Sequence, residues 1–172
     1  SPAFYEGRSS QFHQLINGYH GARIRRYQEI IDNGLIAEFQ QASNGNLAQS
    51  SLLNMLNTKY IIQNPAAANG VLQNPNALGA AWFVSEITTA TSPDEEFELT
   101  LGLNDPAQKA IVPAEEVSST TGNSLGEIEL VDYHPGYWKY ESKNSGDGFA
   151  VFSEIFYPKG FEVTIDGEAT SM

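Results

Sequence analysis

The sequence has no cysteine among its 172 residues. The chain can therefore form no disulfide, and it has no thiolate nucleophile and no cysteine ligand for a zinc or iron–sulfur site. Long apolar runs are also missing, because no stretch approaches the roughly 18 residues that a membrane helix requires. We therefore expect these 172 residues to fold without a membrane-spanning helix of their own.

Basic residues are scarce. Nine Lys and Arg stand against 21 Asp and Glu, which gives a net charge of −12. Because a nucleic-acid backbone is bound by a basic surface, the composition argues against nucleic acid as a partner. Hydrophobic residues make up 41% of the chain and aromatic residues 11%, which is too much apolar material for a disordered acidic chain. The composition therefore predicts a folded, acidic chain of about one domain.

The first 40 residues are predicted to be mainly helical. Their apolar positions recur at spacings of three and four, which places four of them on one helix face: Ile24, Tyr27, Ile31 and Leu35. We expect Asn33-Gly34 to break or kink this helix and the turn cluster 43–46 to end it. A short apolar helix over 47–56 and a strand over 59–62 are predicted to follow.

From residue 63 onward the sequence predicts mostly strands. Residues 63–77 have the composition of a loop or linker, and residues 81–87 predict a strand that is apolar on both faces. Ser92 as N-cap, with Pro93 next and Glu95 three residues after the cap, predicts a helix to about residue 101. Turn residues separate the other predicted strands, which lie at 109–112, 127–133, 137–143, 149–157 and 161–165. Residues 118–124 predict a polar loop.

These patterns predict an α+β fold in which an N-terminal helical segment packs on a mostly antiparallel β-sandwich. Residues 1–62 are the helical segment, which ends in a short strand, and residues 63–172 are the β-rich part; the two form one compact unit. The turn Asp166-Gly167 is followed by only five residues, so the second strand of this hairpin is missing or only begun. We therefore expect the β-rich part to be truncated at its C-terminal end, as a piece of a longer polypeptide.

No motif typical of a catalytic, metal or cofactor site stands out. The dinucleotide fingerprint, the phosphate-loop spacing and the Gly-x-Ser-x-Gly elbow do not occur. Residues 143–154 resemble an EF-hand in spacing, but Lys143 stands where the first carboxylate ligand belongs, so a hairpin turn explains them better. His13 and His20 are seven residues apart, yet Gly18 between them argues against a continuous helix and a shared metal ion. The sequence predicts no catalytic residue, no metal and no cofactor.

Aromatic residues are concentrated in the last third of the chain. Nine lie within 29 residues: Tyr133, Tyr137, Trp138, Tyr140, Phe149, Phe152, Phe156, Tyr157 and Phe161. Flat rings beside polar groups are what sugar-binding sandwiches use. The competing interpretation is core filling, since alternation along the strand places Phe152 and Phe156 on one side and Phe149 on the other. We expect most of these rings to pack inside.

Basic charge is concentrated near the N-terminus. Residues 1–30 hold four arginines against two glutamates, a net charge of +2, so the remaining 142 residues carry −14. One group of side chains there can bind an anionic or sugar-phosphate group by charge-assisted hydrogen bonds and stacking: Tyr19, His20, Arg23, Arg26 and Tyr27. The alternative is that the Arg and Tyr side chains lock the helix onto the β-rich part and bind no ligand.

Four stretches lie in order along most of the length of the chain: INGYHGARIRRYQ at 16–28, LNMLNTKYI at 53–61, NPNALGAAWFV at 74–84 and GFAVFSEIFYP at 148–158. Gly160-Phe161 and Ile165-Asp-Gly167 follow them. Together they resemble the YfhO-like family of large bacterial integral membrane proteins, particularly the versions found in Bacteroidetes-type bacteria. Relatives often carry Gly-Trp where this chain has Gly160-Phe161, so the aromatic ring is kept and an indole donor is lost.

The resemblance implies a polytopic, C-type glycosyltransferase-like parent that uses a lipid-linked sugar, with this chain as its soluble extracytoplasmic domain. The acidic residues expected to transfer the sugar lie in the membrane portion, so this domain is not expected to be catalytic alone. It would scaffold the parent or help to recognise its substrate in cell-envelope glycan assembly, on the periplasmic side of the cell membrane. Its implied partners are the membrane-embedded remainder of the same polypeptide and a glycan or lipid-linked sugar. A non-catalytic carbohydrate-binding sandwich and a purely structural domain remain alternatives.

Overall fold

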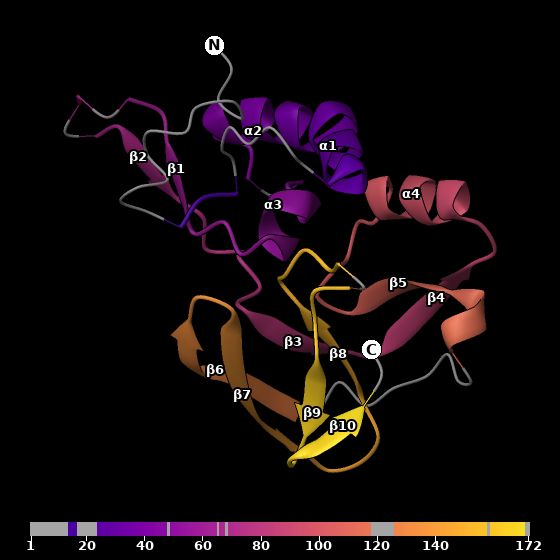
Figure 1. Cartoon of the computed structure of the whole chain (residues 1–172). Helices are drawn as coiled ribbons and strands as arrows, with labels where there is room; N and C mark the ends of the chain where they lie inside the picture. The colour runs from indigo at the N-terminus through magenta and orange to yellow at the C-terminus, as the bar shows by residue number, and fades with distance from the viewer. Residues whose placement is uncertain are drawn as a thin grey trace.

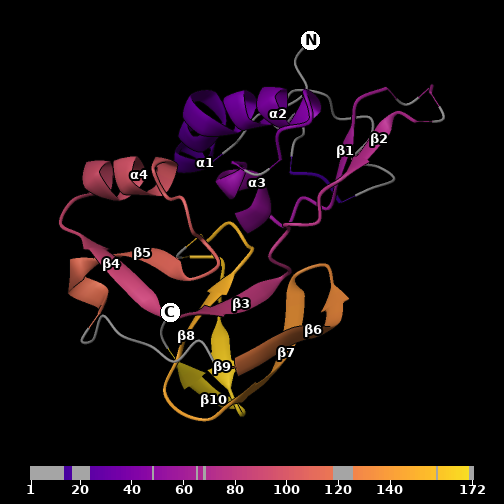
Figure 2. The same cartoon turned by 180° about the vertical axis from the view of Figure 1, so that it is seen from behind.

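The computed structural model describes residues 14–16, 24–47, 49–64, 66–67, 69–117, 126–157 and 159–170. The predicted α+β class is confirmed: in the described residues, one long helix and two shorter α-helices accompany strands that pair in two-stranded ladders (Figure 1). The helices α1 to α4 gather at one end, and β6 to β10 lie at the other (Figures 1 and 2). Within the described ranges, no helix combines the length and the apolar character needed to cross a membrane.

The N-terminal helix is continuous. It comprises α1 (Arg25–Ile30), the π-helical turn η2 (Ile31–Leu35) and α2 (Ile36–Ser43). The predicted apolar face is confirmed at its centre, because Ile31 and Leu35 are fully buried, whereas Ile24 stays 37% exposed. The helix ends at the predicted turn cluster, where Gly45 takes a positive φ of 90° that other residues rarely adopt.

Asn33 and Gly34 do not break the helix, so that prediction is wrong. The backbone widens there into the π-helical turn and continues. Gly34 is the point of closest approach to two neighbours: a Cβ atom on it would lie 2.3 Å from Cδ1 of Leu52 and 2.9 Å from Cδ2 of Leu101. The glycine therefore permits close packing of the helix and does not end it.

Gly34→Ala is expected to destabilise the chain. Forcing a methyl group against buried side chains costs about 1–3 kcal/mol, and the better helix propensity of Ala offsets at most about 1 kcal/mol of that. Urea unfolding should show a net loss of about 1 kcal/mol. The matched control is Gly102→Ala, since the nearest atom to a Cβ there is Glu98 O at 3.5 Å. An unchanged or raised midpoint for Gly34→Ala would show that Leu52 and Leu101 can move aside.

Residues 63–77 are not only a linker, because they contain a strand. After α3 (Ser51–Met55), β1 (Tyr60–Ile62) pairs antiparallel with β2 (Val71–Gln73) in a hairpin that projects from the body (Figure 1). Buried Asn74 ties this hairpin to α3, as its Nδ2 donates to Asn54 Oδ1 and to Thr58 O, both at 2.9 Å. Three residues are too few for a periodic pattern to reveal a strand.

The main core lies between the N-terminal helix, α3 and β1. It consists of Ile31, Leu35, Ala42, Leu52, Leu53 and Ile61. Helix α4 (Pro93–Leu101) reaches this core through the half-buried Leu101. A second set of buried side chains lines β3 and β4 and the chain after α4: Ala81, Val84, Ile87, Ala90 and Leu103. No aromatic ring is fully buried in the part of the chain that the structure describes.

The strand predicted over 81–87 is in fact two strands. β3 (Ala81–Val84) and β4 (Glu86–Ala90) meet at Ser85 and belong to different ladders. β4 pairs with β5 (Lys109–Pro113) in parallel, and α4 connects the two strands as a βαβ unit. The other four ladders are antiparallel, so the sheet pairing is mostly antiparallel, as predicted.

Helix α4 begins where its sequence predicts. The Oγ of Ser92 accepts a hydrogen bond from the Glu95 amide at 3.2 Å, as an N-cap should. The Glu95 carboxylate reaches one residue further back than a capping box requires and accepts from the Thr91 amide at 2.7 Å. The hydroxyl and amide of Thr91 hold the pKa of Glu95 below its ordinary value.

The β-rich end is built from three antiparallel ladders. β3 pairs with β8 (Phe149–Phe152), β6 (Gly126–His134) with β7 (Tyr137–Asn144), and β9 (Val163–Ile165) with β10 (Glu168–Thr170). β3 also lies beside β6. A short 3₁₀ turn (Ala114–Glu116) follows β5. The hairpin across Asp166-Gly167 thus has a second strand. The described residues form no closed sandwich, and the loop predicted at 118–124 lies outside them.

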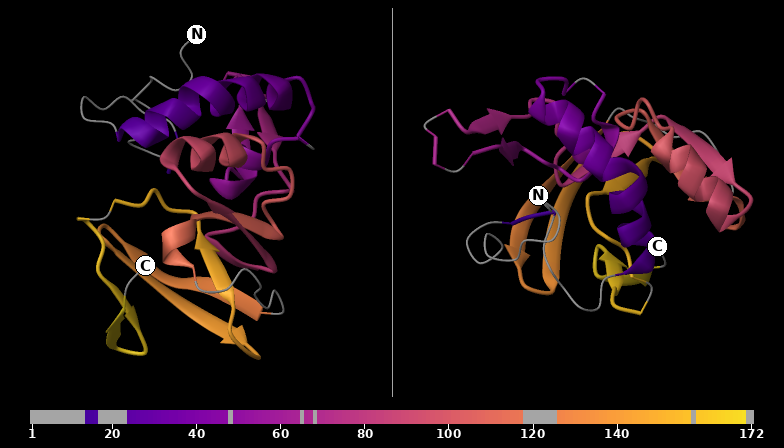
Figure 3. Two further views of the ribbon diagram at one scale, coloured as in Figure 1. Left: turned by 90° about the vertical axis from the view of Figure 1, so that its right-hand side faces the viewer. Right: turned by 90° about the horizontal axis from the view of Figure 1, so that it is seen from above.

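Figure 3 shows this arrangement from two further directions. In the left view, the helices form a layer on one side of β3, β4 and β5, and the long β6–β7 hairpin lies beyond these strands. The two ends of the molecule therefore differ: the helical end contains the main core, and at the β-rich end each strand is hydrogen-bonded to one other strand.

Candidate functional site

The structure describes two of the five residues predicted to bind an anionic or sugar-phosphate group. Tyr19, His20 and Arg23 lie outside the described residues. Arg26 is exposed, whereas Tyr27 is half-buried against the main core and donates its hydroxyl to Ile16 O. This contact gives Tyr27 a structural role, since it fastens residue 16 to the helix. Ligand binding by the group of five stays a prediction.

The aromatic residues of the β-rich end form a different candidate. Six of them make what we call the aromatic surface: Tyr133, Trp138, Tyr140, Phe152, Phe156 and Phe161. Tyr133, Phe152 and Phe156 are 47%, 38% and 48% exposed, and the other three are half-buried. The prediction that most of these rings pack inside is wrong. Alternation along a strand predicts two faces, but it cannot tell whether another layer covers them.

The rings of the aromatic surface support one another. Trp138 stacks on Phe161 with centroids 5.8 Å apart and planes 23° apart, and Tyr133 lies 6.1 Å from Trp138. The ring centroid of Phe156 lies 5.8 Å from that of Phe161. Tyr140 meets Phe152 edge to face at 4.9 Å. Such pairs are worth about 0.5–1.5 kcal/mol each, so the surface is held in place although it is open.

Two polar atoms within the aromatic surface are unsatisfied. Trp138 Nε1 and Tyr140 Oη have almost no exposed surface, and neither forms a hydrogen bond of normal geometry with a described residue. The Glu154 carboxylate is nevertheless close enough to the indole N–H for that N–H to lower its pKa. The two residues are two apart on β7, so their side chains lie on the same face of the strand. Buried polar atoms are nearly always hydrogen-bonded in folded proteins. These two donors therefore mark the polar part of an otherwise apolar surface.

A carboxylate lies beside these two donors. Burial raises the pKa of Glu154 above its ordinary value, and the nearby indole N–H of Trp138 opposes this only in part. Burial also raises the pKa of the Tyr140 hydroxyl, and the negative charge of Glu154 adds to that effect. The site thus combines two donors and one strong acceptor with flat apolar rings.

The pKa of Glu154 leads to a prediction about stability. A carboxyl group whose pKa is raised by folding binds its proton more tightly in the folded chain. Its stabilising contribution is then fully present below the unfolded pKa and is lost as the pH rises through the folded pKa. Glu154→Gln is therefore expected to raise the melting temperature at about pH 7 and to leave it unchanged at about pH 4. Equal shifts in melting temperature at both pH values would show that the raised pKa of Glu154 is not the reason for the effect.

Other kinds of site find no support in the described ranges. No three His, Asp or Glu side chains gather there in a way that would hold a metal ion. His134, at the end of β6, stacks on Tyr137 with ring centroids 4.6 Å apart. These observations leave the aromatic surface with Glu154 as the candidate site of the β-rich end.

Comparison of the chain with known protein families, with curated proteins and with solved structures gave no match. The function is therefore inferred from the geometry and from the sequence motifs.

Sequence reasoning had singled out these rings but not their polar partners. The spacing of Trp138 and Tyr140 on one strand was a usable signal, because it places both donors on one face. Glu154 carried no such signal, since its position depends on how the chain turns after β8.

Proposed function

We propose that this chain is an extracytoplasmic accessory domain of a YfhO-like bacterial membrane protein and that it recognises a glycan through the aromatic surface. The four ordered sequence stretches support the family, and a parent that handles lipid-linked sugars would need to recognise glycans. The observation that carries the glycan proposal is the set of exposed rings, Tyr133, Phe152 and Phe156, in one surface with the half-buried Trp138 and the Glu154 carboxylate.

The chemistry of the aromatic surface suits a sugar. The C–H face of a pyranose ring packs on an aromatic ring, and the aromatic surface exposes the rings of Tyr133, Phe152 and Phe156. Glu154 can accept a hydrogen bond from a sugar hydroxyl, and a charge-assisted bond of this kind is stronger than a neutral one. Because the chain carries a net charge of −12, neutral glycans are favoured over anionic ones.

The same proposal includes the partner of this domain and its location. The partner of this domain is the membrane-embedded remainder of the same polypeptide, and the domain lies on the periplasmic side of the cell membrane. The β3–β8 and β6–β7 ladders belong to one β-sandwich, which the packing of β3 beside β6 supports. The role of the domain is recognition or scaffolding, and glycosyl transfer takes place elsewhere in the parent.

Tryptophan fluorescence tests the glycan proposal. The chain has two tryptophans, and Trp82 donates its Nε1 to Pro106 O at 2.8 Å. In a Trp82→Phe variant, Trp138 is the sole indole, so its emission reports on the aromatic surface alone. Titration with neutral hexose and N-acetylhexosamine oligosaccharides should give a saturable change with a Kd of about 1 mM or tighter. No change with any of them would refute glycan binding at this surface.

A second candidate is a purely structural domain. The exposure of the aromatic surface and of nearby Ile155 and Tyr157, at 38% and 50%, favours it as well. In that case another part of the parent covers the rings and no sugar binds. The same titration separates the two candidates, because only a recognition domain responds to free oligosaccharides.

A further inference from the structure

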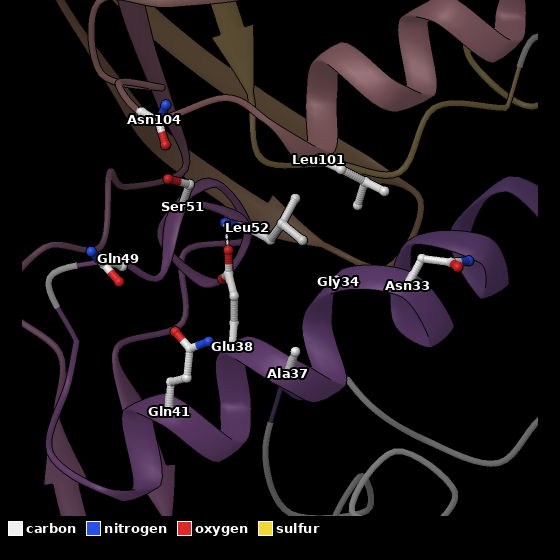
Figure 4. A pocket seen from close by; sticks show the side chains of 10 residues that line it. All are labelled: Asn33, Gly34, Ala37, Glu38, Gln41, Gln49, Ser51, Leu52, Leu101 and Asn104. Atoms are coloured by element: carbon white, nitrogen blue, oxygen red, sulfur yellow. Dashed lines mark hydrogen bonds between the residues drawn. The ribbon is translucent and has the colours of Figure 1, made fainter.

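A cavity at the helical end is separate from the aromatic surface. It has a volume of about 560 Å³ and lies between the N-terminal helix, the start of α3 and the chain around the end of α4 (Figure 4). This volume is within the range of about 300–1,000 Å³ that small-molecule sites occupy. The close-up shows side chains from all three segments facing one another across it.

One carboxylate is fixed at the centre of this cavity. Glu38 rises from α2 toward α3, where its two oxygens accept from the amides of Leu52 and Leu53, both at 3.0 Å (Figure 4). The carboxylate thereby satisfies amides at the start of α3. Burial raises the pKa of Glu38 although the amides of Leu52, Leu53 and Ser51 oppose it.

Carboxamide side chains and an apolar wall complete the lining. Gln41, Gln49 and Asn104 line the cavity on the side of Glu38 and offer both donors and acceptors, whereas Asn33 lies further along the helix and donates its Nδ2 to Glu29 O at 2.9 Å (Figure 4). Leu52 and Leu101 meet at Gly34 and form the apolar side. Gly34 belongs to the π-helical turn η2, and such turns occur frequently at functional sites.

We propose that this cavity binds a small uncharged polyol of about monosaccharide size, either free or as the end of a longer glycan. The lining contains no Lys, Arg or His, and Glu38 repels anions, so phosphate and carboxylate ligands are excluded. Several hydroxyl groups of such a ligand match the carboxamides of the lining. The apolar wall of Leu52 and Leu101 matches the C–H face of a sugar ring.

The test is a ¹⁵N–¹H NMR titration of this chain with glucose, galactose, mannose, N-acetylglucosamine and their methyl glycosides. We expect side-chain amide peaks of the lining residues to shift, with a Kd of about 1–10 mM. Oligosaccharides that end in the bound sugar form a second arm, and they distinguish a free ligand from a glycan end. No shift with any sugar in either arm would overturn the proposal.

Variants show whether the ligand lies in the cavity. Ala37 lines it from an exposed helix position, so Ala37→Phe should fill the space and abolish binding without unfolding the chain. Gln41→Ala should weaken binding about tenfold. Gln40→Ala is the matched control, since Gln40 is an exposed neighbour on the same helix that does not line the cavity.

The side-chain amide peaks of the lining residues report on this cavity and the Trp138 indole peak reports on the aromatic surface, so failure here is distinguishable from failure of the glycan proposal. Undiminished binding by Ala37→Phe would overturn the cavity site. Ala37→Phe and Gln41→Ala should melt within about 2 °C of the unsubstituted chain. Loss of binding then does not result from loss of the fold.

Discussion

Trp138→Ala is expected to weaken oligosaccharide binding at the aromatic surface about thirtyfold or more. Tryptophans at the centre of binding sites typically account for 2 kcal/mol or more of the binding free energy, which corresponds to about that factor. The substitution removes both the ring that stacks on Phe161 and the unsatisfied Nε1 donor. Isothermal titration calorimetry with the tightest-binding neutral oligosaccharide measures the loss.

Trp138→Phe separates the two contributions. It keeps a smaller aromatic ring against Phe161 and removes the indole N–H, so binding should fall less than with Trp138→Ala, by about fivefold. Tyr60→Ala is the matched control, because Tyr60 is an aromatic residue of β1 that is 60% exposed and lies outside the aromatic surface. If Tyr60→Ala weakened binding as much as Trp138→Ala, the rings would act through non-specific adhesion.

Leu53→Ala is expected to lower the free energy of unfolding by about 3 kcal/mol. Leu53 has no exposed surface and packs in the main core with Ile31, Leu35 and Ile61. Truncating a fully buried Leu costs about 2–5 kcal/mol, since transfer free energy is lost and a cavity is left. Urea or thermal unfolding measures this loss.

Ile165→Ala is the matched control for Leu53→Ala. Ile165 is 64% exposed at the tip of the last hairpin, so its truncation should change stability by less than about 0.5 kcal/mol. Equal effects of the two substitutions would contradict a core centred on the N-terminal helix, α3 and β1.

Elements that depend on residues close together in the sequence could be predicted from the sequence. The spacing of Ile31 and Leu35 gave the buried helix face, and Ser92-Pro93 gave the start of α4 to the residue. The turn at Asp166-Gly167 was predicted because αL-prone residues follow an alternating strand, although the pairing of β10 with β9 after it was not. In each case neighbours in the sequence make the decisive contacts.

Features that depend on distant neighbours could not be predicted. Gly34 was expected to break the helix, because nothing nearby in the sequence shows that Leu52 and Leu101 approach it. The parallel pairing of β4 with β5 depends on where α4 places the chain. Whether a ring on β7 or β8 is buried depends on a second layer, which strand alternation does not report.

The candidate sites likewise combine features that follow from sequence spacing with contacts between residues far apart in the sequence. Trp138 and Tyr140 could be placed on one face from their spacing, but the position of Glu154 beside them is a tertiary contact. Glu38 likewise meets the amides of Leu52 and Leu53 across 14 and 15 residues of sequence. Both sites assemble only once the chain has folded.

The most direct test of glycan recognition is the indole region of a ¹⁵N–¹H spectrum during titration with neutral oligosaccharides. Two tryptophans give two indole N–H peaks, and the Trp82 peak is an internal control because its N–H is bonded to Pro106 O. We predict that the Trp138 peak shifts in a saturable way while the Trp82 peak stays in place. An unmoved Trp138 peak at saturating concentrations of every oligosaccharide would contradict glycan recognition by the aromatic surface.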